Sequence, residues 1–362
     1  MLTKVLSNPQ SISSLSATEQ SKLIAEARYF NMLAQLKPLF EQSGQWQVLP
    51  PEVKQHITAA HRVFNHQQTR LGHENRHFQQ TFCSLNIEWI YLKGVAYHLA
   101  NFPEFQGRLM NDIDILVREH SLPEVENALR KQGWLPTHLN DYDQKFYRQW
   151  SQEIPPMRHL NRQTTLDLHF NILPKTIKES PSATLLLSQT VKIANEDGTG
   201  KMLNPAAMVI HSAIHLFYES DFSKGTRDLY DLLLLMTKFS TQPDFWDQLM
   251  SLQNRIGNGR SVFYALRYCQ LVFQLPVPEQ VQKFYQQYQP SKFKTMLADF
   301  AFIRIFIYAF PENRLIGHQI AVWTLYLRGH LKRMPLRLLV PHLMRKSLLS
   351  LIVKEKSAGA CT

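Results

Sequence analysis

The run D-I-D-I-L-V at residues 112–117 constrains the fold of this chain more than any other stretch. Side chains two residues apart in a β-strand point to the same face, so Asp112 and Asp114 would share one face and the isoleucines the other. Two neighbouring carboxylates repel each other and are costly to hold together unless a cation joins them. The run therefore predicts a strand with one buried apolar face and one acidic face, although a lone D-x-D is also typical of two solvated aspartates at a strand end.

A second acidic strand is expected further along the chain. Asp167 lies in the run Leu-Asp-Leu-His at residues 166–169, where apolar neighbours again favour a buried strand. If the two strands are adjacent, Asp167 supplies a third carboxylate beside Asp112 and Asp114. Mg²⁺ suits such a site because it prefers hard oxygen ligands and usually keeps positions for water and phosphates. The sequence predicts a Mg²⁺ site of these three aspartates, with Mn²⁺ as an alternative.

The acidic strand is accompanied by other residues in a fixed order. A strand ending in Leu92-Lys93-Gly94 precedes it, Phe102-Pro103 and Arg108 lie between, and Gly133-Trp134 follows. Over residues 60–135 this order resembles the uncharacterised nucleotidyltransferase family of the polymerase-β-like superfamily, and the run at 166–169 is similar to the family's later acidic strand. In one respect the chain departs from the wider superfamily, which usually has Gly-Ser or Gly-Gly where this chain has Gly94-Val95. No serine hydroxyl is available there for a phosphate, and we expect Lys93 to carry part of that work.

The resemblance implies a Mg²⁺-dependent nucleotidyltransferase that moves a nucleoside monophosphate from an NTP such as ATP to an acceptor hydroxyl. Such chemistry needs a well-positioned triphosphate and metal ions that neutralise charge on the attacking and leaving oxygens. The expected catalytic and metal-binding residues are Asp112, Asp114 and Asp167, and the expected nucleotide-binding residues are Lys93, Gly94, Arg108 and His169. Asp167 is either a metal ligand or the base that accepts the acceptor's proton.

The nucleotide-binding residues have competing structural roles. The Gly94 backbone would let a phosphate approach the amides at the start of the next helix, where the helix dipole favours anions. Lys93 and Arg108 would pair with the β- and γ-phosphates, or instead serve as counter-ions for the carboxylates. His169, on the same strand face as Asp167, would orient that acid, contact the nucleotide or simply pack within the strand.

The pattern of elements predicts an α+β fold with a small mixed sheet. Strands are expected at 86–92, 113–117 and 164–170, with a short helix at 94–101 and loop and strand at 141–163. Another helix should begin at a capping box formed by Ser121 and Glu124 and end at Gly133. The predicted domains are an N-terminal helical region (1–85), a nucleotidyltransferase-like catalytic domain (86–202), an all-α domain (203–313) whose first helix starts at Asn204-Pro205, and a basic helical tail (314–362).

The charge of the chain favours an anionic partner. The formal net charge is +11, and residues 314–356 carry nine Lys or Arg against one acid, Glu355. Such a balance is compatible with nucleotide, nucleic acid or a membrane surface. We expect the basic tail to be a solvated helix pair, a binding surface for RNA or DNA phosphates, or a docking segment for an anionic membrane through Leu338-Leu339 and 348–353. Residues 357–362 are predicted to be disordered.

The remaining features leave the acceptor open. Three widely spaced cysteines, no apolar N-terminal segment and no run of about 20 apolar residues predict a cytoplasmic protein, with peripheral membrane binding as an option. A small molecule, a protein hydroxyl and an RNA end are all compatible acceptors. The alternatives for the whole chain are a non-catalytic nucleotide-binding module and a toxin-like tRNA or RNA nucleotidyltransferase. The polar residues His211, His215, Arg227, Asp228 and Asp231 are expected to form an interdomain network, or to include one that contacts substrate.

Overall fold

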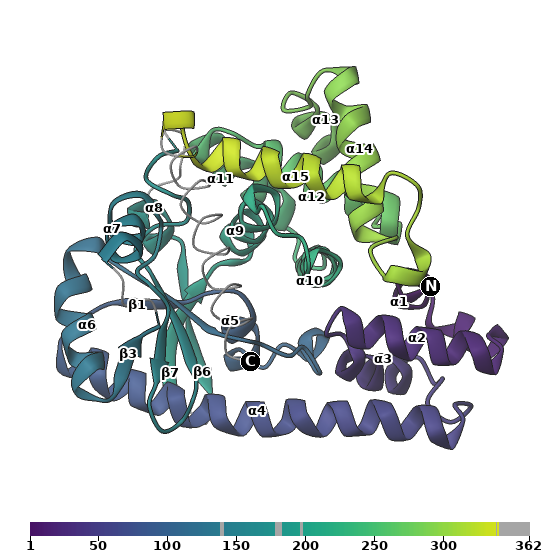
Figure 1. Cartoon of the computed structure of the whole chain (residues 1–362), viewed down its shortest axis with the longest axis horizontal. Helices are drawn as coiled ribbons and strands as arrows, with labels where there is room; N and C mark the ends of the chain where they lie inside the picture. The colour runs from purple at the N-terminus through teal and green to yellow at the C-terminus, as the bar shows by residue number, and fades with distance from the viewer. Residues whose placement is uncertain (138–140, 178–182, 196–197, 338, 340–362) are drawn as a thin grey trace, which may run out of the picture.

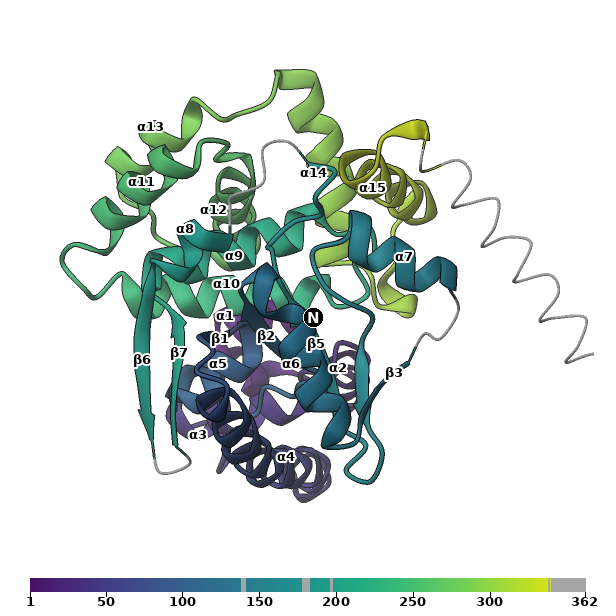
Figure 2. The same ribbon diagram turned by 90° about the vertical axis from the view of Figure 1, so that its left-hand side faces the viewer.

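The centre of the structure is a seven-stranded mixed β-sheet with the strand order β3-β4-β5-β2-β1-β7-β6. The computed structural model describes residues 1–137, 141–177, 183–195, 198–337 and 339. The strands are β1 (Trp89–Tyr91), β2 (Ile113–Val117), β3 (Trp134–Pro136), β4 (Met157–His159), β5 (Thr165–His169), β6 (Thr190–Asn195) and β7 (Gly198–Leu203). Seen from the side, β6 and β7 form one edge of the sheet and β3 lies toward the other (Figure 2).

The middle of the sheet places the predicted acidic strands next to each other. Strand β2 is buried along its whole length, pairs antiparallel with β1 and pairs parallel with β5. In the parallel pair the Cα partner of Asp114 is Asp167. Residues directly opposite each other on neighbouring strands share a face of the sheet, so the two aspartates lie side by side. The mixed sheet that the sequence predicted is confirmed, but it has seven strands, whereas the sequence indicated three by their bounds and a further strand within 141–163.

Helices cover the sheet, and further helices lie beyond it in the N-terminal and C-terminal parts of the chain. The first half contains α1 (Leu2–Ser7), α2 (Ala17–Tyr29), α3 (Leu36–Gln42), α4 (Pro51–Ser84), α5 (Lys93–Leu99), α6 (Leu122–Lys131), α7 (Asp141–Trp150) and α8 (Ala183–Leu187). Helix α4 has 34 residues and, at 1.5 Å per residue, is about 50 Å long. It runs along one side of the molecule and packs on β7, α5 and α6 as well as on α2 and α3 (Figure 1).

From Pro205 onward the described part of the chain is helical. It contains α9 (Pro205–Tyr218), α10 (Gly225–Phe239), α11 (Phe245–Ile256), α12 (Arg260–Phe273), α13 (Glu279–Gln286), α14 (Lys292–Phe306) and α15 (His318–Arg333). Helix α9 lies at its centre and packs on α10, α11 and α12. As the sequence predicted, Asn204 caps α9: its side chain accepts a hydrogen bond of 2.9 Å from the amide of Ala207, and Pro205 occupies the first turn. The α+β fold class, with N-terminal helices and a C-terminal all-α part, is confirmed.

Two local predictions were wrong. Ser121 does not form a capping box, because it ends a 3-10 turn (Glu119–Ser121) in helical conformation and its side chain makes no capping bond. A capping residue needs an extended backbone to turn its oxygen toward the free amides. The first part of the predicted loop and strand at 141–163 is instead helix α7, where Phe146 contacts both Tyr142 and Trp150 at helical spacing. Gly133, in contrast, has φ +92° and ends α6 as predicted.

Part of the predicted basic tail belongs to the packed helices. Helix α15 lies against α14 and α9 and buries Ala321 and Leu325. The Arg328 guanidinium donates a hydrogen bond of 2.9 Å to the carbonyl oxygen of Phe217. Truncating the chain after residue 312 would therefore remove packing as well as charge. Leu338 of the predicted docking segment and the tail from residue 340 onward, including 348–353 and 357–362, lie outside the described residues. No helix in the described part of the chain has both the length and the apolar character needed to cross a bilayer.

Candidate active site

A cavity of about 320 Å³ opens between the sheet and the helices α9, α10 and α15, and most of the predicted site residues line it. Ligand pockets usually have volumes of about 300–1,000 Å³. From the sheet side and α5 the lining includes Lys93, Gly94, Arg108, Asp112, Asp114, Glu153 and Asp167, and from the helical side Ser212, His215, Glu219, Lys224, Arg227, Asp228, Asp231 and Arg333. The cavity therefore joins residues that are far apart in the sequence.

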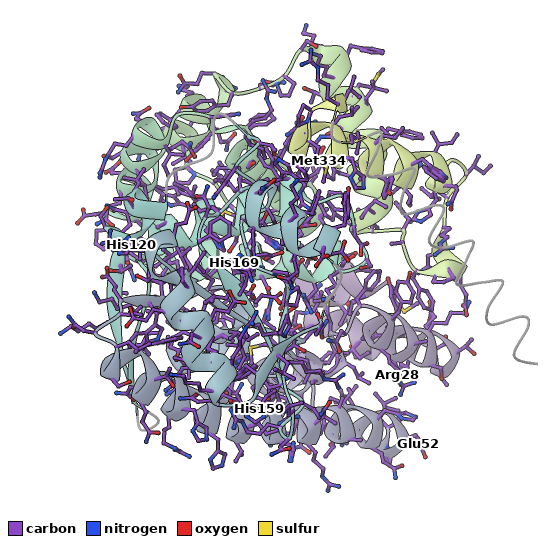
Figure 3. All side chains as sticks on the ribbon, turned by 60° about the vertical axis from the view of Figure 1, so that its left-hand side comes forward. Arg28, Glu52, His120, His159, His169 and Met334 are labelled. Carbon is purple, nitrogen blue, oxygen red and sulfur yellow. The ribbon has the colours of Figure 1, made fainter. Side chains whose placement is uncertain are left out.

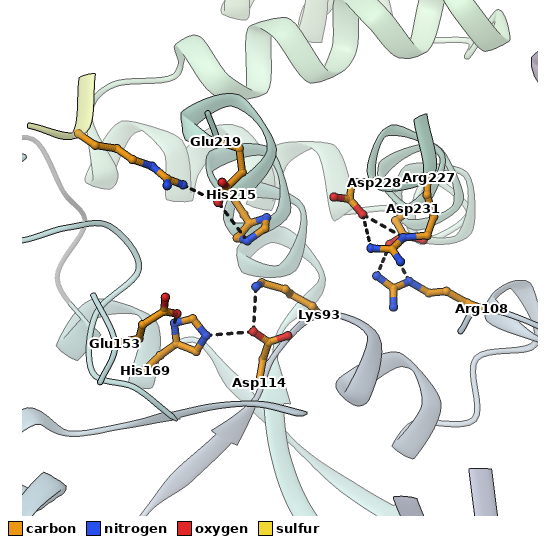
Figure 4. Close-up of polar contacts among 11 residues, drawn as sticks. Lys93, Arg108, Asp114, Glu153, His169, His215, Glu219, Arg227, Asp228 and Asp231 are labelled. Carbon is orange, nitrogen blue, oxygen red and sulfur yellow. Dashed lines mark hydrogen bonds and ion pairs between the residues drawn. The ribbon is translucent and has the colours of Figure 1, made fainter. Parts of the chain in front are cut away.

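Asp114 contacts two basic side chains at the wall of the cavity. Its Oδ1 accepts a hydrogen bond of 2.8 Å from Lys93 Nζ and lies 3.0 Å from Nε2 of His169 (Figure 4). The other ring nitrogen of His169 lies 3.3 Å from a carboxylate oxygen of Glu153. Burial opposes the charge on Asp114, but Lys93 and His169 outweigh it and hold the pKa of Asp114 well below its ordinary value. Asp114 is thus a charged carboxylate at neutral pH.

His169 is held between two carboxylates in the interior of the molecule. Figure 3 places it among the dense side chains at the centre, whereas Arg28 and Glu52 lie at the periphery. Burial lowers the pKa of His169, but the charges of Glu153 and Asp114 outweigh burial, so the net shift is upward. The sequence left three roles open for His169: to orient Asp167, to contact the nucleotide or to pack within the strand. Its contacts are with Asp114 and Glu153, and they favour orientation of Asp114 by a ring that Glu153 fixes in turn.

Asp167 and Asp112 have no such support. The Oδ1 atom of Asp167 is buried without a hydrogen-bond partner among the described residues. Burial, followed by the charges of Asp114 and Glu153, raises the pKa of Asp167 to about 8. Burial and Asp114 also raise the pKa of Asp112. The carboxylates on this wall therefore repel one another, and a bound cation would relieve the repulsion.

The carboxylates fit a divalent cation by their chemistry, although the side chains would have to rearrange to bind it. Within the described ranges, no three His, Cys, Asp or Glu side chains stand ready as a metal site. Asp114 presents Oδ1 to Lys93 and His169, so binding a cation there would change these contacts. A hard cation that takes oxygen ligands would bind the unpartnered oxygen of Asp167 and reduce the repulsion among the aspartates.

Lys93 reaches Asp114 through an unusual backbone. Its φ is +51°, a left-handed conformation that residues other than glycine rarely adopt and that usually costs about 1–3 kcal/mol. Lys93 is also the first residue of α5, and the ion pair with Asp114 compensates for the burial of its ammonium group. Such strain persists only where the surroundings demand one conformation, so the backbone from which the Lys93 side chain extends into the cavity is closely determined.

Gly94 is required by its neighbour Arg108. A Cβ at Gly94 would lie 2.0 Å from Nη1 of Arg108 and 3.0 Å from Cγ of Met110. The first distance is far shorter than the contacts that Cβ atoms make in proteins. From the sequence, we explained the glycine by the approach of a phosphate to its backbone. The contact with Arg108 explains, without any ligand, why a side chain does not fit at Gly94.

Arg108 joins the sheet region to the helical half of the chain. Its Nε donates a hydrogen bond of 2.7 Å to Oδ2 of Asp231 on α10, and both side chains are buried. Beside them, Arg227 pairs with Asp228 at 2.9 Å (Figure 4). Burial raises the pKa of Asp231, and the charge of Arg108 works against that shift. The contacts of Arg108 are thus those of a structural ion pair at the wall of the cavity.

The helical wall contains residues that the sequence did not single out. Glu219, four residues after His215, lies 3.6 Å from that ring and also pairs with Arg333 at the end of α15. The i, i+4 spacing of His215 and Glu219 was a legible signal. Nothing in the sequence near Glu153 or Arg333 indicated a place in the site. His211 does not line the cavity: it is buried, and burial lowers its pKa to about 3.

Comparison with known proteins agrees with the geometry. A family model described as "Uncharacterised nucleotidyltransferase" matches residues 16–274, which is more than half of the chain. Among solved structures, the chain is similar to an antigenic nucleotidyltransferase-like protein from Paracoccidioides brasiliensis, with 12% identity over 56% of this chain and 96% of that chain. The TM-score of that match is 0.30. No curated protein matches the sequence.

Proposed function

Since the chain belongs to the uncharacterised nucleotidyltransferase family, we propose that it is a Mg²⁺-dependent enzyme that transfers a nucleoside monophosphate from an NTP to an acceptor hydroxyl. One observation carries this proposal: Asp114 and Asp167 are paired across two parallel strands, Asp112 adjoins them, and all three line one cavity. A purely structural wall has no use for a charged Asp114 that raises the pKa values of both Asp112 and Asp167.

Asp112, Asp114 and Asp167 would hold Mg²⁺, or Mn²⁺ in its place. When bound, the cation supplies positive charge against the triphosphate and the attacking and leaving oxygens. The rest of the proposal concerns what the chain itself does. Lys93, now paired with Asp114, lies at the cavity wall where its ammonium can turn toward the β- and γ-phosphates once Asp114 is otherwise engaged. His169 and Glu153 keep Asp114 in one orientation.

Asp167 is suited to accept a proton from the acceptor. Its pKa of about 8 makes the Asp167 carboxylate a stronger base than an ordinary aspartate once it has lost its proton, and the charge of a bound cation would favour that loss. In the proposed reaction the acceptor oxygen forms a bond to the α-phosphorus, the bond between that phosphorus and the pyrophosphate oxygen breaks, and the hydroxyl proton passes to Asp167. The residue acts either in this way or as a metal ligand, and the two roles predict different results for substitution by asparagine: a base is lost in the first, a weakened ligand remains in the second.

The transfer is tested with the full-length protein, Mg²⁺ and each of the four NTPs labelled at the α-phosphate, together with a cell extract as the source of acceptors. The proposal predicts transfer of label to one fraction and its loss in Asp114→Asn. Asp247→Asn is the matched control, because Asp247 is an exposed aspartate on α11 away from the cavity. Label in RNA, protein or small molecules identifies the acceptor class. Mg²⁺-dependent NTP binding without label in any fraction and without pyrophosphate release would show a binding module and overturn the proposed transfer.

A further inference from the structure

The outer faces of α14 and α15 expose an unusual number of large apolar side chains. Eighteen large hydrophobic residues are exposed in the described part of the chain, and eleven of them fall between residues 293 and 336. They are Phe293, Met296, Leu297, Phe300, Leu315, Ile316, Ile320, Trp323, Leu327, Leu331 and Leu336, and we call them the α14–α15 face. A soluble monomer rarely exposes so many apolar side chains together unless they serve binding.

The spacing shows that each helix contributes one stripe. On α15, Ile320, Trp323, Leu327 and Leu331 recur at steps of three and four residues, so they lie on one side of the helix. The opposite side is fixed against the protein: a Cβ at Gly329 would lie 2.6 Å from the carbonyl oxygen of Glu219 at the end of α9. Because the side with Gly329 packs on the protein, the apolar stripe of α15 points outward.

Helix α14 is apolar on two sides. One side buries Phe302, Ile305 and Phe306 in the core, and the other exposes Phe293 and Phe300. A helix that only covers a core has a polar outer face. The two stripes adjoin each other, since the ring of Phe300 lies 3.0 Å from where a Cβ of Gly317, just before α15, would be. Figure 2 shows both helices at the periphery of the molecule.

The charge around the α14–α15 face has one sign. Lys292, Lys294 and Arg337 are exposed next to its apolar residues and make no ion pair among the described residues. The acids of the region are already paired with bases. Asp299 binds Arg267 and Glu312 lies 3.7 Å from Lys22. The face thus presents an apolar centre with an uncompensated basic rim.

We propose that the α14–α15 face docks the protein on an anionic lipid bilayer. Apolar side chains that enter the headgroup region, an aromatic residue such as Trp323 and a rim of Lys and Arg are the features that bind an interfacial helix to anionic lipid. A second copy of the chain would bring two basic rims together, which opposes that contact. Residues 340–362 carry four Lys or Arg against one acid and so have the same sign as the rim. Nucleic acid would match the charge but not the aliphatic stripe.

The docking inference is independent of the proposed nucleotidyl transfer, because no residue of the α14–α15 face lines the cavity. Helix α15 nevertheless ends at Arg333, which does line it. Docking would therefore hold the cavity at a constant position relative to the membrane surface.

The test is flotation of the full-length protein with phosphatidylcholine vesicles that contain about 30% phosphatidylglycerol, and with pure phosphatidylcholine vesicles. Anionic vesicles should carry the protein, neutral ones should carry little, and high salt should weaken the binding. The variant Ile320→Glu with Trp323→Glu, and separately Lys292→Glu with Lys294→Glu, should each lower the bound fraction at least about tenfold. Val63→Glu is the matched control, because Val63 is exposed on α4, which lies on the other side of the molecule from α15 (Figure 1).

Further measurements keep the test decisive. Circular dichroism shows whether each variant folds, and a vesicle-induced blue shift of tryptophan fluorescence that Trp323→Phe removes without lost binding would place Trp323 at the lipid. The proposal is overturned if the full-length protein does not bind anionic vesicles. It is equally overturned if the variant that combines Ile320→Glu with Trp323→Glu binds them as well as the wild type. It is also overturned if sedimentation shows a dimer that this variant dissociates, or if RNA is bound and vesicles are not.

Discussion

Replacing Asp167 by asparagine should stabilise the protein in the absence of metal, although the same change impairs its proposed function. The folded protein raises the pKa of Asp167 from 3.8 to about 8 through burial and the charges of Asp114 and Glu153. Between these two values the unfolded chain has lost the proton while the folded chain retains it. The folded state therefore binds more protons, and its stability falls as the pH rises from about 4 to about 8. Asparagine cannot ionise and removes this contribution.

The size of the effect follows from the shift. Each pKa unit corresponds to about 1.4 kcal/mol, so the penalty is about 4 kcal/mol at pH 7 and less than half of that at pH 5. Because Asp167 is partly accessible to solvent, these values are upper limits. We expect Asp167→Asn to raise the free energy of unfolding by about 2–4 kcal/mol at pH 7, and by clearly less at pH 5.

Urea unfolding at pH 5, 6 and 7 in the presence of EDTA measures this difference. Asp247→Asn, at an exposed site on α11, is the control and should leave the free energy of unfolding unchanged. Adding Mg²⁺ and NTP should then favour the wild type, because a ligand that binds only the folded state stabilises it by mass action. An Asp167→Asn protein that is less stable than wild type at pH 7, or whose advantage is the same at pH 5 and pH 7, would refute the electrostatic reasoning.

Three further substitutions test the surroundings of the carboxylates. Arg108→Met should lower the free energy of unfolding by about 3–5 kcal/mol in urea unfolding, because it leaves the Asp231 carboxylate buried without its partner, and Asp231→Asn should recover part of that loss in the double variant. Gly94→Ala should destabilise the wild type but much less the Arg108→Met protein, since the clash is with the guanidinium. Lys93→Met should weaken the binding of NTP more than that of NMP in calorimetry, and equal losses would show that Lys93 does not contact the β- and γ-phosphates.

The parts of the site that were predictable from the sequence are those with a local pattern. Alternation of acidic and apolar residues in two short runs was enough to place Asp114 and Asp167 on strands with matching faces, because the period of a strand is fixed at two. The asparagine-proline start of α9 was legible for a similar reason: the cap acts within three residues. These signals do not depend on the rest of the fold.

The remainder depends on contacts between distant segments. Arg108 and Asp231 are separated by 123 residues, and only tertiary packing decides that the guanidinium meets this carboxylate rather than a ligand. Glu153 enters the site because its backbone pairs with that of His169 in an isolated bridge, which has no sequence signature. Arg333 was counted with the basic tail, yet the packing of α15 on α9 carries it to the cavity. Ser121 failed as a cap because the preceding turn had already taken helical geometry.

The central claim is that Asp112, Asp114 and Asp167 act together as one site for a metal ion and a nucleotide. Titration calorimetry of the full-length protein with each NTP, in Mg²⁺ and in EDTA, tests it most directly when repeated on Asp112→Ala, Asp114→Ala and the control Asp247→Ala. The account predicts that one NTP binds with Mg²⁺, that EDTA abolishes this binding, and that both cavity variants lose it while they stay folded and the control retains it. Unchanged Mg²⁺-dependent affinity in Asp112→Ala and Asp114→Ala would contradict the account.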